Sequence, residues 1–434
     1  MFNTIFYIIS LISFGLTFFL YKTMKIYLLR KKYSHLPGPK TNGIIGFYMG
    51  NLDLAIKYLN EGKILADLML ELSKTYGTVF RFQIVDKIIV FTIDQEAVKE
   101  ILISENFPKI PEIYHNVGFP FNERFLGHGL ITDTNFDRWK KRRALFNHGF
   151  QQHVLINAIT DFNLKIDLLL ERLRTLADGK TQVILFNEIN HAALDIIAKV
   201  AFGMNVDSIN DPKNELNHYV YEGIKGFYRQ TFDPFLMYKP HEWKFISNYK
   251  KIIRKLRNIG RKHLLKKLMD LQDNGFVSDD ILSNLLKNHY DNKFNLDTMI
   301  DDFLTFFVAG QETTANTLAF CVLELARNPR VLKKVREELD NVLGSKSYLE
   351  YEDVNKLKYL NCVYKETLRF WPPIPEIARL ARQDFKINGY HIPKDSWIQL
   401  STYVSGRYDS YFENPNSFLP ERFLFDSEKN QTKH

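Results

Sequence analysis

Apolar residues recur at helical spacing along residues 303–325, starting from Phe303. Either Asn295 or Asp297 can cap the start of such a helix, and the Asn-Pro pair at 328–329 ends it. The pattern therefore predicts a helix of roughly 30 residues, about 45 Å long at 1.5 Å per residue, which is long enough to cross a whole domain.

The middle of this predicted helix reads Ala-Gly-Gln-Glu-Thr-Thr over residues 309–314. A glycine in a helix costs about 1 kcal/mol against alanine, and a buried carboxylate is unfavourable unless it is paired. One interpretation is a kink whose polar groups bond back to the preceding turn. The other is a helix opened at mid-length, so that a ligand approaches the backbone at Ala309 and Gly310. In that case Glu312 and Thr313 would supply a proton path.

The remaining pattern is mostly helical, with short strands near both ends of the chain. Residues 118–134 are irregular and rich in aromatic side chains, and we expect them to form a loop over a pocket. The basic run 250–267 is typical of an amphipathic helix with a solvated face. We therefore predict a mainly α fold (α+β), a helical domain with a small β-sheet. The predicted helices are 55–74, 98–104, 136–150, several within 155–271, and 353–370; the predicted strands are 78–82, 87–92 and short segments after 377.

Residues 2–21 carry no charged side chain and are dominated by Ile, Leu and Phe, and several lysines and arginines follow them. About 20 apolar residues can span a bilayer, and the basic flank predicts that the rest of the chain stays cytosolic. A cleaved signal peptide would have a charged start and a small-residue cleavage site, which this segment lacks. We predict a single transmembrane helix in residues 1–35, which form an anchor and a basic, proline-containing hinge, and one large domain over 36–434.

The composition narrows the class of protein. Only two cysteines, Cys321 and Cys362, occur in 434 residues, which favours a reducing compartment over a disulfide framework, and neither has metal-ligand spacing. The net charge of +8 and the pI near 9.0 suggest an acidic partner or an anionic surface. The basic residues are scattered along helices without a recognition motif, so we do not expect nucleic-acid binding.

A group of charged residues that can pair with one another lies near the C-terminus. Glu366 and Arg369 are three residues apart on a predicted helix, so their side chains share a face and can pair. Arg422 follows in the Pro-Glu-Arg-Phe turn at 420–423. Because a guanidinium group binds a carboxylate in bidentate fashion, we expect these three residues to form a structural lock.

Five motifs in order together resemble the cytochrome P450 superfamily. They are the hinged anchor, Trp139-x-x-x-Arg143, the Ala-Gly-Gln-Glu-Thr-Thr helix, Glu366-x-x-Arg369 and Pro-Glu-Arg-Phe. Within that superfamily, the segments 125–130, 199–204, 301–320 and 401–407 are most similar to the cholesterol 24-hydroxylases.

The resemblance implies a haem-dependent monooxygenase that hydroxylates a sterol, with haem b as cofactor and an NADPH-dependent reductase as electron donor. It implies an endoplasmic reticulum membrane protein with a single span and a cytosolic catalytic domain. Trp139, Arg143 and Arg379 would bind the haem propionates. Glu312 and Thr313 would deliver protons, and Ala309 and Gly310 would leave room for oxygen and substrate. The Glu366–Arg369–Arg422 lock would brace the side that faces the reductase.

In this family a cysteine thiolate binds the haem iron, in a Phe-x-x-Gly-x-Arg-x-Cys-x-Gly loop downstream of Pro-Glu-Arg-Phe. The residues after Phe423 contain neither Gly nor Cys. Cys321 and Cys362 lie in apolar helical segments, where free cysteines are usually packing residues. We therefore expect a chain truncated before its haem-ligand segment, with the ligand beyond His434. Two alternatives stay open: a haem-free, membrane-anchored remnant with at most a binding role, and a fatty-acid hydroxylase.

Overall fold

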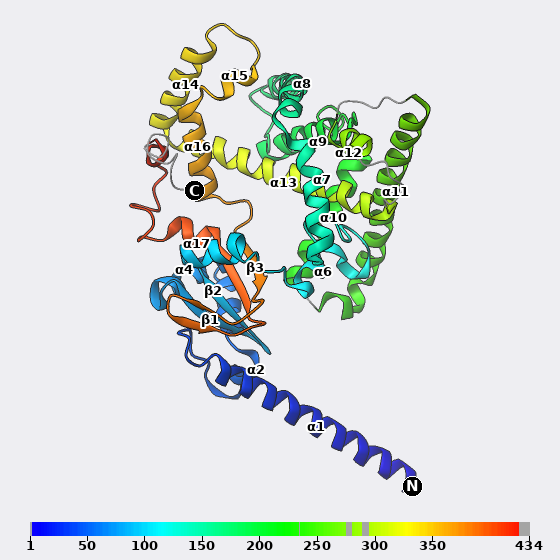
Figure 1. Ribbon diagram of the computed structural model, residues 1–434, viewed down its shortest axis with the longest axis vertical. Helices are drawn as coiled ribbons and strands as arrows, with labels where there is room; N and C mark the ends of the chain where they lie inside the picture. The colour runs from blue at the N-terminus through cyan, green and yellow to red at the C-terminus, as the bar shows by residue number, and fades with distance from the viewer. Residues whose placement is uncertain (1, 234, 275–279, 289–294, 425–434) are drawn as a thin grey trace. The chain divides into compact units, whose positions relative to one another are not determined.

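The computed structural model describes residues 2–233, 235–274, 280–288 and 295–424. It divides into two compact units, and each unit combines segments that are distant in sequence (Figure 1). The first unit is Met1–Ile110 with Ile374–Ser417, and the second is Pro111–Pro373 with Phe418–His434.

The first unit contains a four-stranded sheet in the order β1-β2-β6-β3. The strand β1 (Val79–Ile84) pairs antiparallel with β2 (Lys87–Thr92), and both correspond to strands that the sequence predicts. From the C-terminal part of the chain, β6 (Trp397–Ser401) lies parallel to β2, and β3 (Glu376–Leu380) pairs antiparallel with β6. The hairpin of β4 (Phe385–Ile387) and β5 (Tyr390–Ile392) forms a separate small sheet. The prediction of a minor sheet built by both ends of the chain is confirmed.

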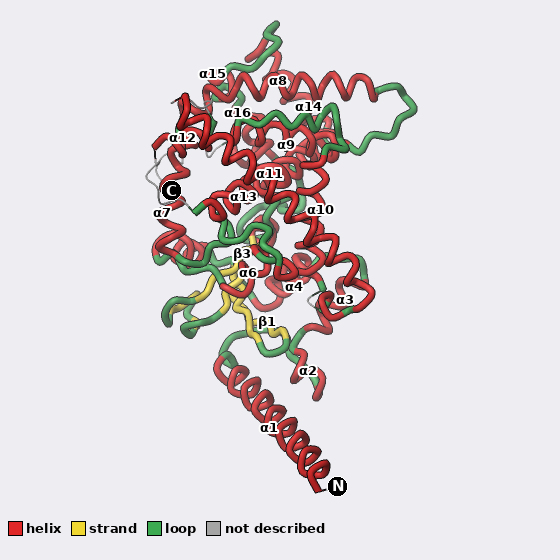
Figure 2. The backbone as a smooth tube through the Cα atoms, turned by 90° about the vertical axis from the view of Figure 1, so that its right-hand side faces the viewer, coloured by secondary structure: helices red, strands yellow, loops and turns green. Residues whose placement is uncertain are grey.

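Short helices accompany this sheet, and Figure 2 shows α2, α3 and α4 at one side of it. The rings of Phe80 and Phe91 stack 4.8 Å apart, centroid to centroid, in one of the apolar clusters of the unit. The helices are α2 (Gly43–Met49), α3 (Leu52–Asn60), α4 (Leu65–Tyr76), α5 (Gln95–Lys99), which continues as a π-helix over Glu100–Ser104, and α17 (Thr402–Arg407).

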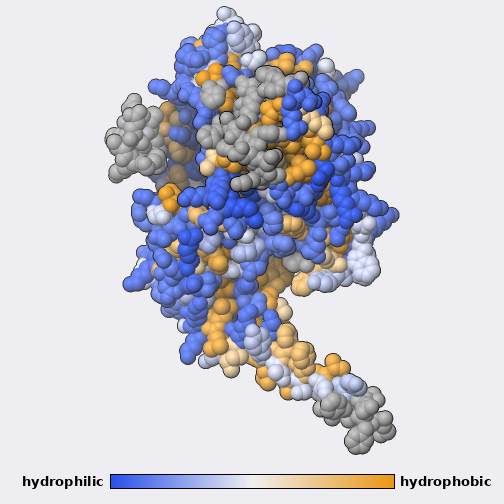
Figure 3. Space-filling model, turned by 45° about the vertical axis from the view of Figure 1, so that its right-hand side comes forward, coloured by the Kyte–Doolittle hydropathy of each residue, from blue (hydrophilic) through white to orange (hydrophobic). Residues whose placement is uncertain are grey.

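The N-terminal helix α1 (Phe2–Lys32) precedes these elements. Large apolar side chains from Leu11 to Leu28 are exposed along it, which Figure 3 shows as an apolar surface over the described part of the helix. Among the residues that the structure describes, no helix combines the length and the apolar character needed to cross a membrane. The predicted transmembrane helix is therefore not confirmed.

The second unit is helical, and its long helix α13 (Leu296–Arg327) packs along α9 (Leu185–Phe202) (Figure 1). Asn295 caps α13 by accepting hydrogen bonds from the backbone nitrogens of Asp297 and Thr298, at 2.9 and 3.4 Å. The predicted long helix and its cap are thus confirmed. The other helices are α6 (Pro111–Gly118), α7 (Phe136–Asn147), α8 (Gln152–Leu176), α10 (Glu215–Phe232), α11 (Trp243–Asn274), α12 (Ile281–Asn288), α14 (Pro329–Leu343), α15 (Tyr351–Val354) and α16 (Lys358–Phe370).

The basic run on α11 has the predicted amphipathic pattern. Ile253, Leu256 and Leu264 are buried, whereas most of the lysines between them are exposed. Lys267 is an exception, because it is buried and donates to Ser283 at 2.7 Å. Most of this basic face is therefore solvated.

The aromatic segment 118–134 differs from the prediction. Phe121 and Phe125 are fully buried in the main core of the second unit, and the Phe121 ring lies 5.1 Å from the ring of Tyr249 on α11. Both rings are used for packing, because burial of a phenylalanine in a core is strongly favourable. The expectation that these aromatic side chains cover a pocket is wrong for these two.

Candidate active site

The middle of α13 is a continuous helix, without the break that one interpretation of the sequence requires. The Thr313 hydroxyl donates to the carbonyl of Ala309 at 2.6 Å, and Thr317 bonds back to Thr313 at 2.9 Å. The hydroxyls therefore bond back to the preceding turn, as the alternative interpretation predicts. This arrangement does not exclude a chemical role, because a donating hydroxyl still has lone pairs that can accept.

Gly310 lies where α13 packs closely against α9. A Cβ atom at this position would lie 2.7 Å from the Cδ1 and Cγ1 atoms of Ile197 on α9, much closer than side-chain atoms normally approach. The glycine therefore lets α9 and α13 approach closely. The close contact with Ile197 accounts for a glycine here, and the space for oxygen that the sequence suggested stays a prediction.

One face of α13 is less completely covered at this point. Phe303, Leu304 and Phe307 are buried, but Phe306, Ala309, Gly310 and Thr313 are only partly buried. The side chains of Ala309 and Thr313 lie one turn apart and are small. Ala309 and Thr313 are therefore partly accessible along this face of α13.

Glu312 occupies a different environment from the other acidic residues of α13. It lines a cavity of about 690 Å³, whose walls include residues of α9, α10 and α13. The hydroxyl of Tyr228 on α10 donates to Glu312 Oε1 at 3.3 Å. Burial raises the pKa of Glu312, and burial, with a smaller contribution from the Glu312 carboxylate, raises the pKa of Tyr228 to about 12. No cation is paired with Glu312 among the residues that the structure describes.

The lining of this cavity is polar. Gln311 and Asn190 each place a buried side-chain oxygen here that accepts no hydrogen bond within the described part of the chain. A buried acceptor without a partner is unfavourable, so water or a polar ligand is expected beside these amides. Neither Tyr228 nor this cavity was predicted from the sequence, because α10 and α13 are joined only by tertiary packing.

The predicted propionate ligands lie in both units. Trp139 and Arg143 are one turn apart on α7 of the second unit, so they share a face; Trp139 is partly buried against the core, and Arg143 is exposed. Arg379 lies on β3 of the first unit, where its Nη1 donates to the carbonyl of Ala378 at 2.9 Å. The first two residues are brought together, and the third is placed separately.

The structure brings the three residues of the predicted lock into contact. Glu366 is fully buried and accepts from Arg369 Nε at 2.7 Å, from Arg369 Nη2 at 2.8 Å and from Arg422 Nε at 3.2 Å. The backbone nitrogen of Leu419 also donates to it, at 2.8 Å. The lock therefore fixes the turn at Pro420–Phe423 to α16.

Glu421 extends this lock and was not predicted. It pairs with Arg330, accepts from Lys334 Nζ at 2.9 Å and accepts from the Tyr359 hydroxyl at 2.9 Å. These partners hold its pKa well below the usual range for a glutamate. The same turn is thus tied to α14 and α16 by two carboxylates.

The two cysteines do not provide a haem ligand. Both are buried, and burial raises the pKa of the Cys321 thiol, which disfavours the thiolate that iron requires. Cys362 is buried within α16, which forms the lock. Among the described residues, Trp139 and Arg143 could hold the propionates of a haem, and neither buried cysteine is presented as a thiolate for its iron.

Comparisons with known proteins agree on one family. The sequence model described as cytochrome P450 matches residues 45–434. The probable cytochrome P450 4d20 of Drosophila melanogaster is 30% identical over 421 residues, which are 91% of this chain and 80% of that protein. Cytochrome P450 3A17 of Cavia porcellus is 26% identical over 96% of this chain and 84% of its own length, and cytochrome P450 3A11 of Mus musculus is 27% identical over 93% and 79%. These relatives do not support the expected similarity to cholesterol 24-hydroxylases in particular.

Proposed function

Because this chain belongs to the cytochrome P450 family, whose members are haem-dependent monooxygenases, we propose that it hydroxylates an apolar lipid with dioxygen and with electrons from an NADPH-dependent reductase. The observation that carries the proposal is Glu312. This carboxyl group lies in a polar cavity, carries no charge partner among the described residues, and is followed directly by Thr313.

In this proposal Glu312 holds a proton and passes it on. Its raised pKa makes the neutral acid more populated than for a solvated glutamate, and Tyr228 orients one of its oxygens. The Thr313 hydroxyl donates its single proton to the Ala309 carbonyl, so its lone pairs can accept a hydrogen bond, and it passes a proton on only when its own O–H turns away from Ala309. Haem, when bound, supplies the oxygen chemistry. Trp139, Arg143 and Arg379 would hold its propionates.

For the substrate we propose a sterol, with a fatty acid as the alternative. Support for a sterol comes from the segments 125–130 and 401–407, which resemble sterol hydroxylases. The burial of Phe121 and Phe125 removes the support that an aromatic loop over the site would have added. Titration of the haem-loaded protein with cholesterol and with dodecanoate separates the two, since the true substrate displaces water from the iron and shifts the absorption spectrum.

We further propose that α1 holds the protein at the endoplasmic reticulum membrane, with the catalytic units in the cytosol. The exposed apolar side chains from Leu11 to Leu28 support membrane contact, because such a surface is unfavourable in water. Deletion of residues 1–29 should move the protein toward the soluble fraction while the rest stays folded. Complete retention in salt-washed membranes would contradict this role of α1.

The test of the proton path is Thr313→Ala, with Thr314→Ala as the matched control, since Thr314 is exposed one residue away. Loss of the Thr313 hydrogen bond should cost about 1 kcal/mol of stability. Loss of a positioned proton donor should lower the product formed per NADPH by about 10²–10⁴-fold, while NADPH is still consumed and peroxide is released. Unchanged coupling in Thr313→Ala would contradict the proton path.

The absorption spectrum of the reduced, carbon-monoxide-treated protein tests whether the chain binds haem through a thiolate. Thiolate-bound haem gives a red-shifted band, whereas a haem-free remnant gives none. The burial of both cysteines is the observation that favours the second function, a haem-free binding role.

A further inference from the structure

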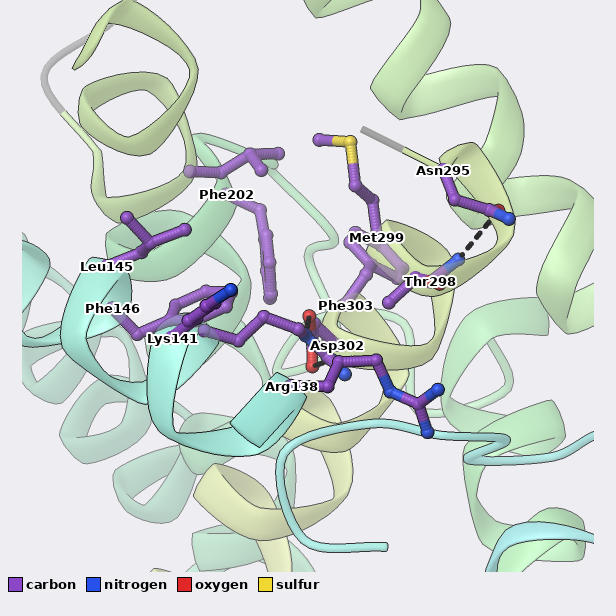
Figure 4. Close-up of a pocket in the computed structure, with 12 residues that line it drawn as sticks. Arg138, Lys141, Leu145, Phe146, Phe202, Asn295, Thr298, Met299, Asp302 and Phe303 are labelled. Atoms are coloured by element: carbon purple, nitrogen blue, oxygen red, sulfur yellow. Dashed lines mark hydrogen bonds and ion pairs between the residues drawn. The ribbon is translucent and has the colours of Figure 1, made fainter. Parts of the chain in front are cut away.

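A second cavity lies near the N-terminal end of α13, between that helix, α7, the end of α9 and the start of α12. Figure 4 shows Lys141, Leu145 and Phe146 of α7 on one side, and Asn295, Thr298 and Met299 at the start of α13 on the other. Its volume is about 300 Å³. That value lies at the lower end of the range of about 300–1,000 Å³ for small-molecule sites.

The inner walls of this cavity are apolar. Leu145, Phe146, Phe202, Met299 and Phe303 face it, together with Leu282. Such a lining favours an alkyl chain, because each buried methylene group contributes about 0.8 kcal/mol. A small inorganic anion would leave these walls without a partner.

Three of the six polar residues at the same cavity are basic. Arg138 is paired with Asp133 through two bonds of 2.7 Å, and Arg142 is paired with Asp302 and, at 3.2 Å, with Asp133. Lys141 forms no ion pair or hydrogen bond with any residue that the structure describes. The cavity therefore offers one uncompensated cation next to apolar walls, which is the complement of a single-chain anionic amphiphile.

We propose that this cavity binds a medium-chain fatty carboxylate, with the carboxylate at Lys141 and the chain between Phe146, Met299 and Phe303. Arg138, which is half-exposed, lies at the same cavity with its charge compensated by Asp133. The site is distinct from the candidate active site: Met299 and Glu312 are 13 positions apart on α13, about 20 Å at 1.5 Å per residue. The proposal does not depend on the monooxygenase activity, and its test needs no haem.

The test is binding of decanoate to the full-length chain by titration calorimetry, with decylammonium and decanol as probes with the same chain. Lys141→Glu should weaken decanoate binding at least tenfold. Lys140→Glu is the matched control, because Lys140 is the exposed neighbour on α7, does not line the cavity and undergoes the same charge change. It should change the affinity less than threefold.

A second variant tests the apolar walls. Met299→Trp fills the cavity and should abolish decanoate binding, and thermal unfolding of each variant verifies that it is folded. Since both α7 changes are at exposed positions, Lys141→Glu stays informative even where the tryptophan variant fails to fold. Equal affinities of Lys141→Glu and Lys140→Glu, or decylammonium binding as tightly as decanoate, would overturn the proposal.

Discussion

Two regions of the same helix use carboxylates in opposite ways. Near its N-terminal end, Asp301 is fully buried and accepts from Arg124 Nη2 at 2.8 Å, from Arg257 Nη1 at 2.7 Å and from the His128 backbone nitrogen at 2.8 Å. In the middle, Glu312 has only the Tyr228 hydroxyl as a partner in the described part of the chain. The first carboxylate is surrounded by permanent charges, and the second faces a polar cavity.

The two carboxylates differ in function: one holds segments of the chain together, and the other can exchange a proton. Asp301 and Asp302 fasten the segment 118–134 to α13, since they accept from the backbone of His128 and Leu130. Gly127 permits this approach: its φ is +50°, and a Cβ there would lie 2.3 Å from the Asp301 carboxylate. Asp301 is held by two arginines and serves structure, whereas Glu312 has a raised pKa and faces a cavity, so it can exchange a proton. The comparison predicts where a substitution costs stability and where it costs activity.

The largest expected effect on stability is that of Asp301→Ala. The change leaves two guanidinium groups facing a buried site without their partner, and breaking a buried ion pair typically costs about 3–5 kcal/mol. Asp297→Ala is the control, because Asp297 binds the same arginines from a position with a 44% exposed side chain. In urea unfolding, the control should lose less than about 1 kcal/mol of unfolding free energy. Equal losses for the two variants would mean that Asp301 is not the structural carboxylate.

Asp302 should make stability depend on pH. Desolvation raises its pKa from 3.8 to about 6, although Arg142 and the Leu130 backbone nitrogen oppose this shift, and the neighbouring Asp301 charge adds to it. Between about pH 4 and 6 the unfolded state loses this proton while the folded state keeps it, so stability falls as pH rises and then levels off above pH 6. The total change is about 3 kcal/mol at 1.36 kcal/mol per unit. The difference in unfolding free energy between wild type and Asp302→Asn should follow this window, and a pH-independent difference would contradict it.

Glu312→Gln should act on chemistry instead. The amide keeps the size of the side chain and can still accept from Tyr228, so stability should change by less than about 1 kcal/mol. The amide does not release a proton, so product per NADPH should fall on the order of 100-fold in the haem-loaded protein. A fall in stability that accounts for the whole loss of product would place Glu312 with Asp301 as a structural residue.

The sequence predicted the parts of this arrangement that are local. The α13 helix follows from its apolar spacing and Asn295, and the Glu366–Arg369–Arg422 contact follows from a three-residue spacing and a proline-fixed turn. The partners of the α13 carboxylates did not follow, because Arg124, Arg257 and Tyr228 lie far away in sequence. Asp301 and Asp302 are adjacent carboxylates within an apolar stripe, and this pattern was the available sign that they need buried partners. Nothing in the local pattern pairs Gly310 with Ile197.

The smallest expected effect concerns Tyr228→Phe. Its hydrogen bond stabilises the ionised form of Glu312 and so lowers the pKa of that carboxyl group, against the larger opposite effect of burial. Without the hydroxyl the pKa of Glu312 should rise further, and the neutral acid should persist to higher pH. Loss of one hydrogen bond should cost about 0.5–1.5 kcal/mol of stability. The carboxyl stretching band in the infrared spectrum, assigned by its absence in Glu312→Gln, reports the titration without any need for haem. Tyr221→Phe is the control, since Tyr221 lines the same cavity but is mostly exposed. The contrary result is an unchanged Glu312 titration in Tyr228→Phe together with a shifted one in Tyr221→Phe. The Tyr228 hydroxyl would then not set the pKa of Glu312. The contrast between the two regions of α13 would rest on solvent access alone.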